Sequence, residues 1–163
     1  MKRYRLRGFG RRGLVRSRLG NLFAFAAMSL LAFTPAASAS TTIRISNDGG
    51  GSIAARVSEI ESIRSRGQKV EIRVGYCNSA CTLYLGLPNT CVSPGARFGF
   101  HGPQIATKGL TMLPSQFEKW SQVMANHYPR PLRNWFMNSA RHSTDLITIK
   151  GDQLIALGVS QCV

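Results

Sequence analysis

Residues 70–81, VEIRVGYCNSAC, combine the patterns of a strand and of a helix without a loop between them. Residues 70–74 alternate apolar and polar side chains, the pattern of a β-strand with one buried face. The apolar residues 80–87 that follow are expected to form a short buried helix, which Pro88 ends. The stretch therefore predicts a strand that turns directly into a helix, with Ser79 at the turn.

A second strand of the same kind precedes this one. Residues 42–46, TIRIS, alternate in the same way, and the run NDGGGS at residues 47–52 stops them. Apolar residues at helical spacing then continue to Gly67, which can end a helix. Strands that alternate with helices favour an α/β fold with a largely parallel sheet.

The rest of the chain continues this alternation. Short strands are expected on both sides of a Ser-Pro-Gly turn, and Pro129 and Pro131 separate two amphipathic helices. One apolar stripe of these helices holds Trp120, and the other holds Trp135; both rings are expected to fill the core or a subunit contact. The expected elements are strands at 91–92 and 97–100, a brief strand or an extended link at 146–149, and helices at 114–127, from 132 onward and at 151–157.

The first 39 residues form a separate segment. They hold eight basic residues and no acidic one, an apolar run at 22–33 and the small residues Ala37, Ser38 and Ala39. This order is typical of a cleaved secretory signal peptide, and the run is short for a membrane span. An uncleaved anchor is the alternative, and Arg11-Arg12 also resembles a twin-arginine export signal. We expect a periplasmic or secreted domain, residues 40–163, with no stable membrane span after cleavage.

The net charge is misleading unless this segment is set aside. The whole chain carries +14, which would suggest a nucleic-acid partner. Eight of its 21 basic residues precede residue 40 and all seven acidic residues follow it, so the remainder carries +6. Those cations are spread without a run, as on ordinary solvated faces. The sequence therefore argues against nucleic-acid binding.

All four cysteines lie in the expected domain, and disulfides are the default in an exported chain. Four cysteines allow three pairings. Cys77 and Cys81 flank a chain reversal, while Cys91 and Cys162 precede and end the remaining elements, which favours the pairs 77–81 and 91–162. A zinc site from Cys77, Cys81, Cys91 and His101 is the rival, but no second close ligand pair follows the Cys-x3-Cys spacing. We expect no metal and no cofactor.

The chemistry-bearing residues gather around the two strand ends. Gly50 and Ser79 follow consecutive strands, where an α/β sheet binds its ligands and helix N-termini offer free N–H groups. A serine at such a turn, glycines that shape an anion hole and a downstream His101 are the components of a serine acyl-transfer site. The plainer alternative is that Ser79 only caps the following helix. His127 and His142 are expected to be surface or structural.

These motifs resemble the Clp protease proteolytic subunit within the ClpP/crotonase superfamily, over residues 43–159. Residues 45–53, ISNDGGGSI, are similar to the family's strand and Ser-Pro-Gly-Gly-Ser loop, and residues 77–83, CNSACTL, to its nucleophile turn. Residues 98–103, FGFHGP, are similar to the segment with the catalytic histidine. The resemblance implies a ClpP/crotonase-like fold, with a mostly parallel sheet, ββα-type units and a C-terminal helical handle over residues 114–140.

The resemblance also implies roles. Ser79 would be the nucleophile and His101 its base, with the N–H groups of Gly50 and Ala80 as the oxyanion hole. Asp145 lies one residue from the expected third triad position, and either an insertion after it or a dyad without it would account for this. The implied protein is a serine hydrolase, a peptidase on peptide or protein substrates, and a homo-oligomer. The alternative is a non-catalytic binding or scaffold protein of the cell envelope that kept only the fold.

Overall fold

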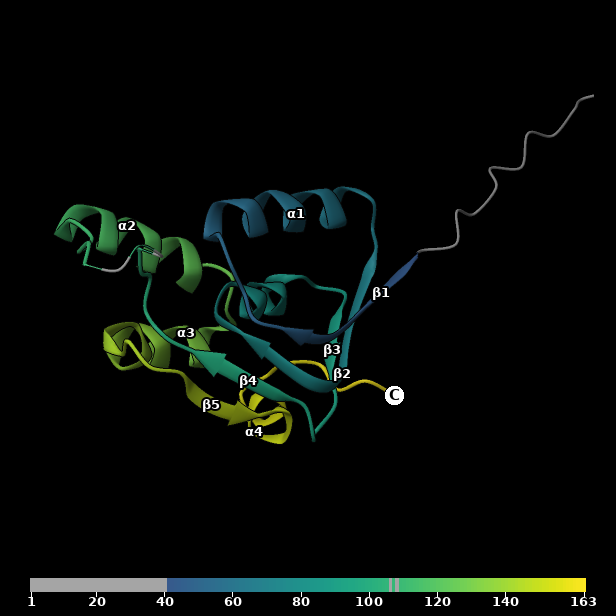
Figure 1. The fold of residues 1–163 in the computed structure, drawn as a ribbon. Coiled ribbons are helices and arrows are strands. Elements are labelled where there is room, and N and C mark those ends of the chain that lie inside the picture. Colours follow the sequence, from purple (N-terminus) through teal and green to yellow (C-terminus); the bar gives the residue numbers. More distant parts are fainter. Residues whose placement is uncertain (1–40, 106, 108) are drawn as a thin grey trace, which may run out of the picture. The chain divides into compact units, whose positions relative to one another are not determined.

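The strand at the centre of the sheet is β2, Lys69–Asn78, and three other strands pair with it. The computed structural model describes residues 41–105, 107 and 109–163. β1, Thr42–Asp48, runs parallel to β2 along one edge. On the other edge, β3, Thr90–Val92, is parallel to the first half of β2, and β4, Arg97–Phe100, to its last residues (Figure 1).

β5, Ile147–Lys150, completes the sheet and is the one strand of the described chain that runs antiparallel to its neighbour, β4. The strand order is β1-β2-β4-β5, with β3 beside β2. The predicted α/β fold with a mostly parallel sheet is thus confirmed. The sequence predicted a short strand or an extended link at 146–149, and did not predict its direction.

The helices follow the predicted order with small shifts at their ends. The predicted buried helix at 80–87 is a 3₁₀ helix that starts at Ser79. The first helix begins where the Ser52 hydroxyl accepts the N–H of Ala55 at 3.3 Å. The helical segments are α1 Ile53–Ser65, the 3₁₀ helix η1 Ser79–Gly86, α2 Pro114–Ala125, α3 Arg130–Asn138, the 3₁₀ turn η2 Ala140–His142 and α4 Gly151–Ala156.

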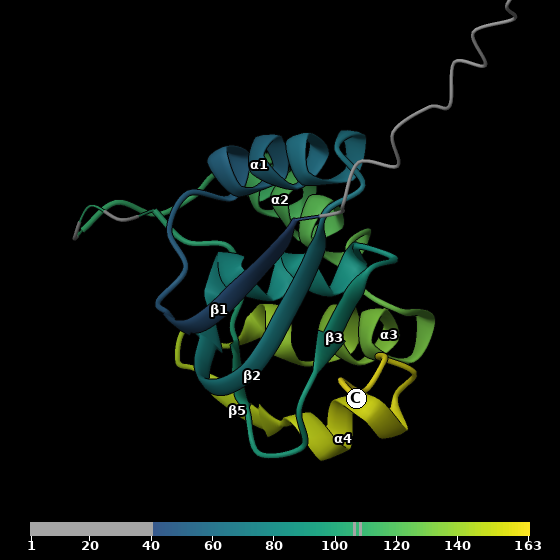
Figure 2. The same cartoon turned by 90° about the vertical axis from the view of Figure 1, so that its right-hand side faces the viewer.

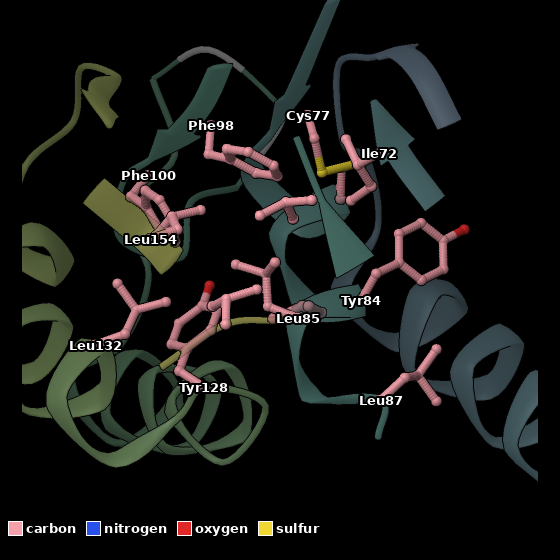
Figure 3. Packing of buried hydrophobic residues seen from close by; sticks show 14 of the residues in the cluster. Ile72, Cys77, Tyr84, Leu85, Leu87, Phe98, Phe100, Tyr128, Leu132 and Leu154 are labelled. Atoms are coloured by element: carbon pink, nitrogen blue, oxygen red, sulfur yellow. A yellow bond between two sulfur atoms is a disulfide. The ribbon is translucent and has the colours of Figure 1, made fainter. Parts of the chain in front are cut away.

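The core lies between one face of the sheet and the helices. Aromatic rings build much of it: Phe100 meets Tyr128 with ring centroids 5.7 Å apart, and Trp135 at 5.4 Å, both edge to face. Burial of each such side chain contributes about 1.5–3 kcal/mol. Figure 3 shows this packing, whose labelled members are Ile72, Cys77, Tyr84, Leu85, Leu87, Phe98, Phe100, Tyr128, Leu132 and Leu154.

The last residues of the chain are fastened to β3. A disulfide joins Cys91 to Cys162, and Val92 forms a parallel bridge with Gln161. A second disulfide joins Cys77 to Cys81, so the structure has the two pairs that the sequence favoured. All four sulfurs are bonded, which leaves no thiolate for the rival zinc site. Two disulfides are compatible with an oxidising compartment.

The predicted signal peptide, residues 1–39, and its cleavage site before Ser40 lie outside the described residues. Within the described chain, no helix has the length and apolar character that a membrane span requires. The domain boundary at residue 40 stays a prediction.

Candidate active site

Two chain reversals meet at one edge of the sheet and build the site. In the register of β1 and β2, Asp48 lies opposite Cys77. The glycine loop that follows Asp48 and the turn that follows Asn78 therefore start side by side, as the sequence predicts for the carboxyl ends of parallel strands.

Ser79 has an unusual backbone. It is the only non-glycine residue of the described chain with a left-handed φ, +55°. A left-handed residue with a Cβ costs about 1–2 kcal/mol, and such strain collects at functional sites. The capping alternative is wrong, because Asn78 holds the cap position and the Ser79 hydroxyl makes no capping bond. The Ser79 carbonyl instead accepts the Thr82 hydroxyl at 2.7 Å, and Thr82 in turn bonds the buried Tyr128 hydroxyl at 2.8 Å.

The Cys77–Cys81 disulfide spans the turn. Both cysteines are fully buried and lie two residues before and two residues after Ser79. The bond closes the strand end onto the first turn of η1, so it restricts the backbone that carries the Ser79 hydroxyl. The bridge does not close off the serine, because Ser79 still lines an open cavity.

Gly50 packs directly on Ser79. Its φ is +101°, and a Cβ added to it would lie 2.6 Å from the Ser79 Cβ, 2.7 Å from the Asn78 carbonyl oxygen and 3.0 Å from the Ala80 nitrogen. No side chain fits at those distances. Gly50 is therefore the point at which the glycine loop and the serine turn touch.

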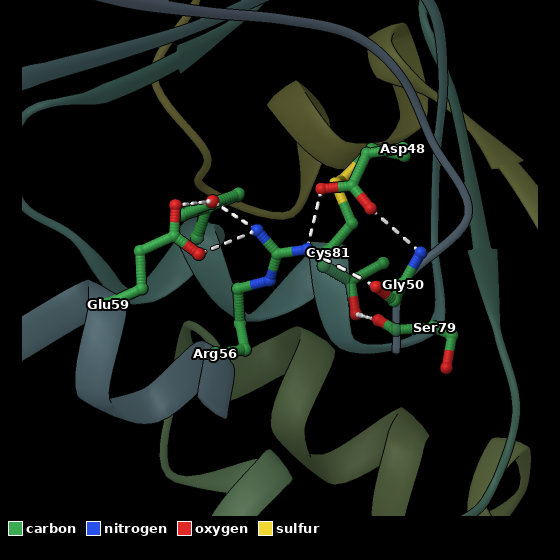
Figure 4. A network of polar contacts seen from close by, with 9 residues as sticks. Asp48, Gly50, Arg56, Glu59, Ser79 and Cys81 are labelled. Carbon is green, nitrogen blue, oxygen red and sulfur yellow. Dashed lines mark hydrogen bonds and ion pairs between the residues drawn. A yellow bond between two sulfur atoms is a disulfide. The ribbon is translucent and has the colours of Figure 1, made fainter. Parts of the chain in front are cut away.

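A network of hydrogen bonds and ion pairs around Asp48 and Arg56 holds the glycine loop in place (Figure 4). The Gly50 N–H donates to Asp48 Oδ1 at 2.8 Å, and Arg56 Nη2 donates to Asp48 Oδ2 at 2.7 Å. Arg56 Nη1 reaches Glu59 Oε2 at 3.0 Å and the Tyr84 hydroxyl, which donates to Glu59 Oε1 at 2.7 Å. Burial, and next the bond to Glu59, raise the pKa of Tyr84. The network is mostly shielded, since the Arg56 side chain is 12% exposed.

This network changes the predicted oxyanion hole. The Gly50 N–H is already used by Asp48, and in Figure 4 the Gly50 nitrogen points toward Asp48 while the Ser79 hydroxyl points the other way. Ala80 is fully buried directly after Ser79, and no hydrogen bond of its N–H is present among the described residues. Of the two predicted donors, one is engaged and one is free in this structure.

His101 follows β4 and lines the same cavity as Ser79. Its Nδ1 lies 2.6 Å from the Gly102 carbonyl oxygen. A carbonyl only accepts, so Nδ1 carries the hydrogen and Nε2 is left as an acceptor. That tautomer suits a base that takes a proton from a hydroxyl. The structure has no hydrogen bond between Ser79 and His101.

Gly102 fixes the histidine segment in turn. Its N–H donates to the Ser143 carbonyl at 3.0 Å, and a Cβ on it would lie 1.8 Å from the Arg141 carbonyl oxygen. The backbone beside His101 is thus pressed against η2. No wider residue fits at position 102 without a backbone shift.

Asp145 is not brought to His101. It is exposed, and its backbone N–H donates to the Ser143 hydroxyl at 3.2 Å. Its carboxylate has no hydrogen-bond partner among the described residues. The Gly102 carbonyl occupies the His101 Nδ1–H that a triad carboxylate would bind. The two other histidines lie apart from the site: His127 bonds the Val123 carbonyl, and His142 contacts Arg141.

The cavity beside Ser79 has a volume of about 690 Å³. None of its described lining residues is charged. The apolar part of the wall comes from Ile53 of α1, Met112 before α2, Trp120 and Met124 of α2, and Ile105 after β4. Trp120 is half-buried and lines the cavity, so it does not fill the core; a subunit contact through this ring stays a prediction. No pattern in the sequence indicates this position, because the apolar stripe of α2 faces the core and the cavity at once.

The comparison of structures found similar folds, whereas the comparisons of sequence found no match. No known family model matches the chain, and no curated protein matches it. Among solved structures, the chain is similar to the membrane-bound stomatin-specific protease 1510-N, a mutant in complex with a substrate peptide, with a TM-score of 0.56 and 19% identity. The match covers 73% of this chain and 58% of the protease chain. At this identity the likeness shows that the two chains share a fold and shows nothing about activity.

Proposed function

We propose that this protein is an exported serine hydrolase that cleaves peptide bonds, with Ser79 as nucleophile and His101 as general base. The observation that carries the proposal is the left-handed backbone of Ser79 at a strand end, in one cavity with a histidine of the right tautomer. Such a turn presents a serine hydroxyl at the edge of a sheet, as in other serine hydrolases. The ClpP-like fold, shared with a protease, supports it.

The proposed reaction follows from these positions. A rotation of the Ser79 side chain brings Oγ to His101 Nε2, which takes the proton as Oγ attacks the substrate carbonyl carbon. The tetrahedral oxyanion accepts the Ala80 N–H and, once Asp48 releases it, the Gly50 N–H. His101 then gives its proton to the leaving amine, and a water molecule hydrolyses the acyl-enzyme by the same steps in reverse.

For the third position we propose a dyad rather than a triad. The bond from His101 Nδ1–H to the Gly102 carbonyl can hold the ring and its tautomer without a carboxylate. Asp145 remains the sequence-based candidate, and loop movement would have to bring it to the ring. Replacement of Asp145 by Ala should therefore cost little activity compared with loss of His101.

The composition of the cavity wall favours one class of peptide substrate. Its described wall is uncharged and rich in apolar side chains, so a neutral, apolar peptide segment fits it better than a charged one. The solved protease to which this chain is similar was bound to a substrate peptide. We further propose secretion or a periplasmic location, which the two disulfides support, and a homo-oligomer formed through α2 and α3, the helices in the place of the family's handle.

An active-site probe tests the proposal. The oxidised protein should be labelled by a fluorophosphonate at Ser79, and Ser79→Ala should abolish the label. Ser52→Ala is the matched control, because Ser52 lines the same cavity but lies outside the turn, and it should keep the label. Equal labelling of wild type and Ser79→Ala would contradict the proposal, as would an unreactive wild type with both disulfides intact.

A binding protein without catalysis is the second candidate. Two observations favour it: Ser79 and His101 share no hydrogen bond, and the Gly50 N–H is occupied. An unreactive Ser79, together with peptide binding that Trp120→Ala abolishes, would select this candidate.

A further inference from the structure

The face of the sheet turned away from the core is basic. Alternation along β2 places Lys69, Glu71 and Arg73 opposite the buried Val70 and Ile72. Arg44 on β1 is in register with Glu71 and shares this side. Past an irregularity in β2, Tyr76 is exposed and Cys77 is buried; Arg97 on β4 is in register with Tyr76, and Lys150 on β5 with Arg97, so both lie on the exposed side. We call the six residues Lys69, Glu71, Arg73, Arg44, Arg97 and Lys150 the basic face. In Figure 2 no helix crosses in front of β1, β2 and β3.

The positive charge of the domain is concentrated on this face. Of the 13 basic residues after residue 39, five belong to the basic face, with one of the seven acidic residues. The face thus holds +4 of the net +6. The rest of the domain, with eight basic and six acidic side chains, is close to neutral. A sheet face that is only exposed to solvent does not require the cations of the domain to be concentrated on it.

Most of these cations have no internal partner. Glu71 is shared by Arg73 at 2.9 Å and Arg44 at 3.6 Å, and the hydrogen bond from Arg73 lowers the pKa of Glu71. Among the described residues, no acidic side chain pairs with Lys69, Arg97 or Lys150. Arg97 and Lys150 even lie directly opposite each other on β4 and β5. Like charges in that position destabilise a sheet, and an external anion would relieve them.

Two large side chains are exposed where β1 and β2 pair irregularly. The pairing of β1 with β2 is irregular between Ile72 and Tyr76, and here Val74 is 63% exposed and Tyr76 38% exposed. Tyr76 is in register with Arg97. An exposed aromatic ring with a polar end, next to a cation on a basic face, is typical of a protein surface that enters a lipid headgroup layer.

We propose that the basic face docks the domain on an anionic lipid bilayer. The charges are distributed over four strands and are not aligned along a groove that one polymer strand could follow. The hollow that Lys69 and Arg73 border is small, about 230 Å³. A headgroup plane offers anions in two dimensions, which matches a broad sheet face. This proposal does not depend on the chemistry of Ser79.

Vesicle sedimentation tests the proposal. The chain from Ser40 is used, because it contains every described element and both disulfides but omits a basic segment with its own attraction to anionic lipid. It should sediment with vesicles of phosphatidylcholine and phosphatidylglycerol, not with pure phosphatidylcholine, and salt should release it.

Charge variants locate the binding surface. Arg97→Glu places a carboxylate opposite Lys150, so the fold should be at least as stable as the wild type, as a thermal melt would verify. The loss of two charge units on the face should weaken binding about thirtyfold. Arg64→Glu is the matched control, since it makes the same charge change on an exposed residue of α1, and its binding should stay close to wild type.

Three results would overturn the proposal. They are equal binding to neutral and anionic vesicles, equal weakening by Arg97→Glu and Arg64→Glu, and binding to heparin without binding to either vesicle. The last result would assign the face to a soluble polyanion.

Discussion

The backbone N–H of Gly50 donates to the carboxylate of Asp48 at 2.8 Å, although Gly50 is the residue that packs on Ser79. The other oxygen of this carboxylate is held by Arg56 at 2.7 Å. The proposed oxyanion donor therefore has a charged competitor within its own loop. In the proposed mechanism the substrate carbonyl oxygen must displace Asp48 from this N–H, so Asp48 should influence the rate.

Asp48→Asn should raise kcat with little change in KM. A hydrogen bond to a neutral amide is weaker by about 1 kcal/mol than one to a carboxylate, so the Gly50 N–H is released more easily, by about fivefold. Steady-state kinetics on a peptide substrate measure this. Asp152→Asn, an exposed change on α4, is the control and should have no effect. A fall in kcat would mean that Asp48 orders the loop instead of competing for its donor.

Gly50→Ala should destroy the site and destabilise the fold by about 2–4 kcal/mol. The new Cβ would lie 2.6 Å from Ser79 Cβ, and the φ of +101° is unfavourable for any residue with a side chain. Gly49→Ala, its neighbour, meets nothing within 4 Å and should cost less than about 1 kcal/mol. Urea unfolding measures the stability of both variants. Equal losses of stability would contradict the close packing of Gly50 on Ser79.

Ser79→Ala and His101→Ala should each lower kcat by about 10⁴-fold or more, and the double variant should be no worse than either. The two side chains act as one unit, since the base has nothing to activate without the nucleophile. Circular dichroism confirms the fold of each variant. Additive losses would show that the residues act in separate steps, and undiminished turnover in Ser79→Ala would remove the serine mechanism.

The two disulfides should differ in their effects. The Cys91–Cys162 bond has a sequence separation of 71, so its replacement by two alanines should cost about 4 kcal/mol of stability; the Cys77–Cys81 bond, separated by 4, should cost about 2 kcal/mol. The smaller change should nevertheless have the larger effect on labelling of Ser79, because it frees the turn. Denaturant curves and probe labelling of both double variants test whether the bond with the smaller effect on stability has the larger effect on labelling.

Stability should fall in alkaline solution because of Tyr128. Burial raises the pKa of Tyr128 in the folded chain, while in the unfolded chain the group titrates near about 10. The contribution to stability is therefore complete below about pH 10 and declines above it, by up to about 1.4 kcal/mol per pH unit, as the unfolded state loses its proton first. Tyr128→Phe should remove the contribution of Tyr128 to this decline, and Tyr84, whose pKa is also raised in the folded chain, should account for a further part. Denaturant unfolding curves at increasing pH measure both.

Local patterns in the sequence predicted the elements well. Alternation placed β1 and β2, and the glycine run after Asp48 and the prolines around Arg130 marked breaks that the structure has. The meeting of Gly50 with Ser79 also followed from order alone, because parallel strands bring their carboxyl ends to one edge.

Contacts that depend on distance in space were not predictable in this way. Nothing local indicates that Arg56 reaches both Asp48 and Tyr84, since their proximity depends on how α1 lies over η1. The bond from His101 to the Gly102 carbonyl likewise depends on the turn that η2 imposes on Gly102. The antiparallel direction of β5 has no signature in four residues.

The Cys77–Cys81 bond also determines how this protein must be prepared. Chain synthesised in a reducing cytoplasm would keep both thiols, and the serine turn would lack its covalent closure. An assay on such material would not test the proposed hydrolase, because the turn that carries Ser79 would lack its disulfide. Recovery from an oxidising compartment, with a mass measurement that finds both bridges, is the condition under which a negative result has meaning.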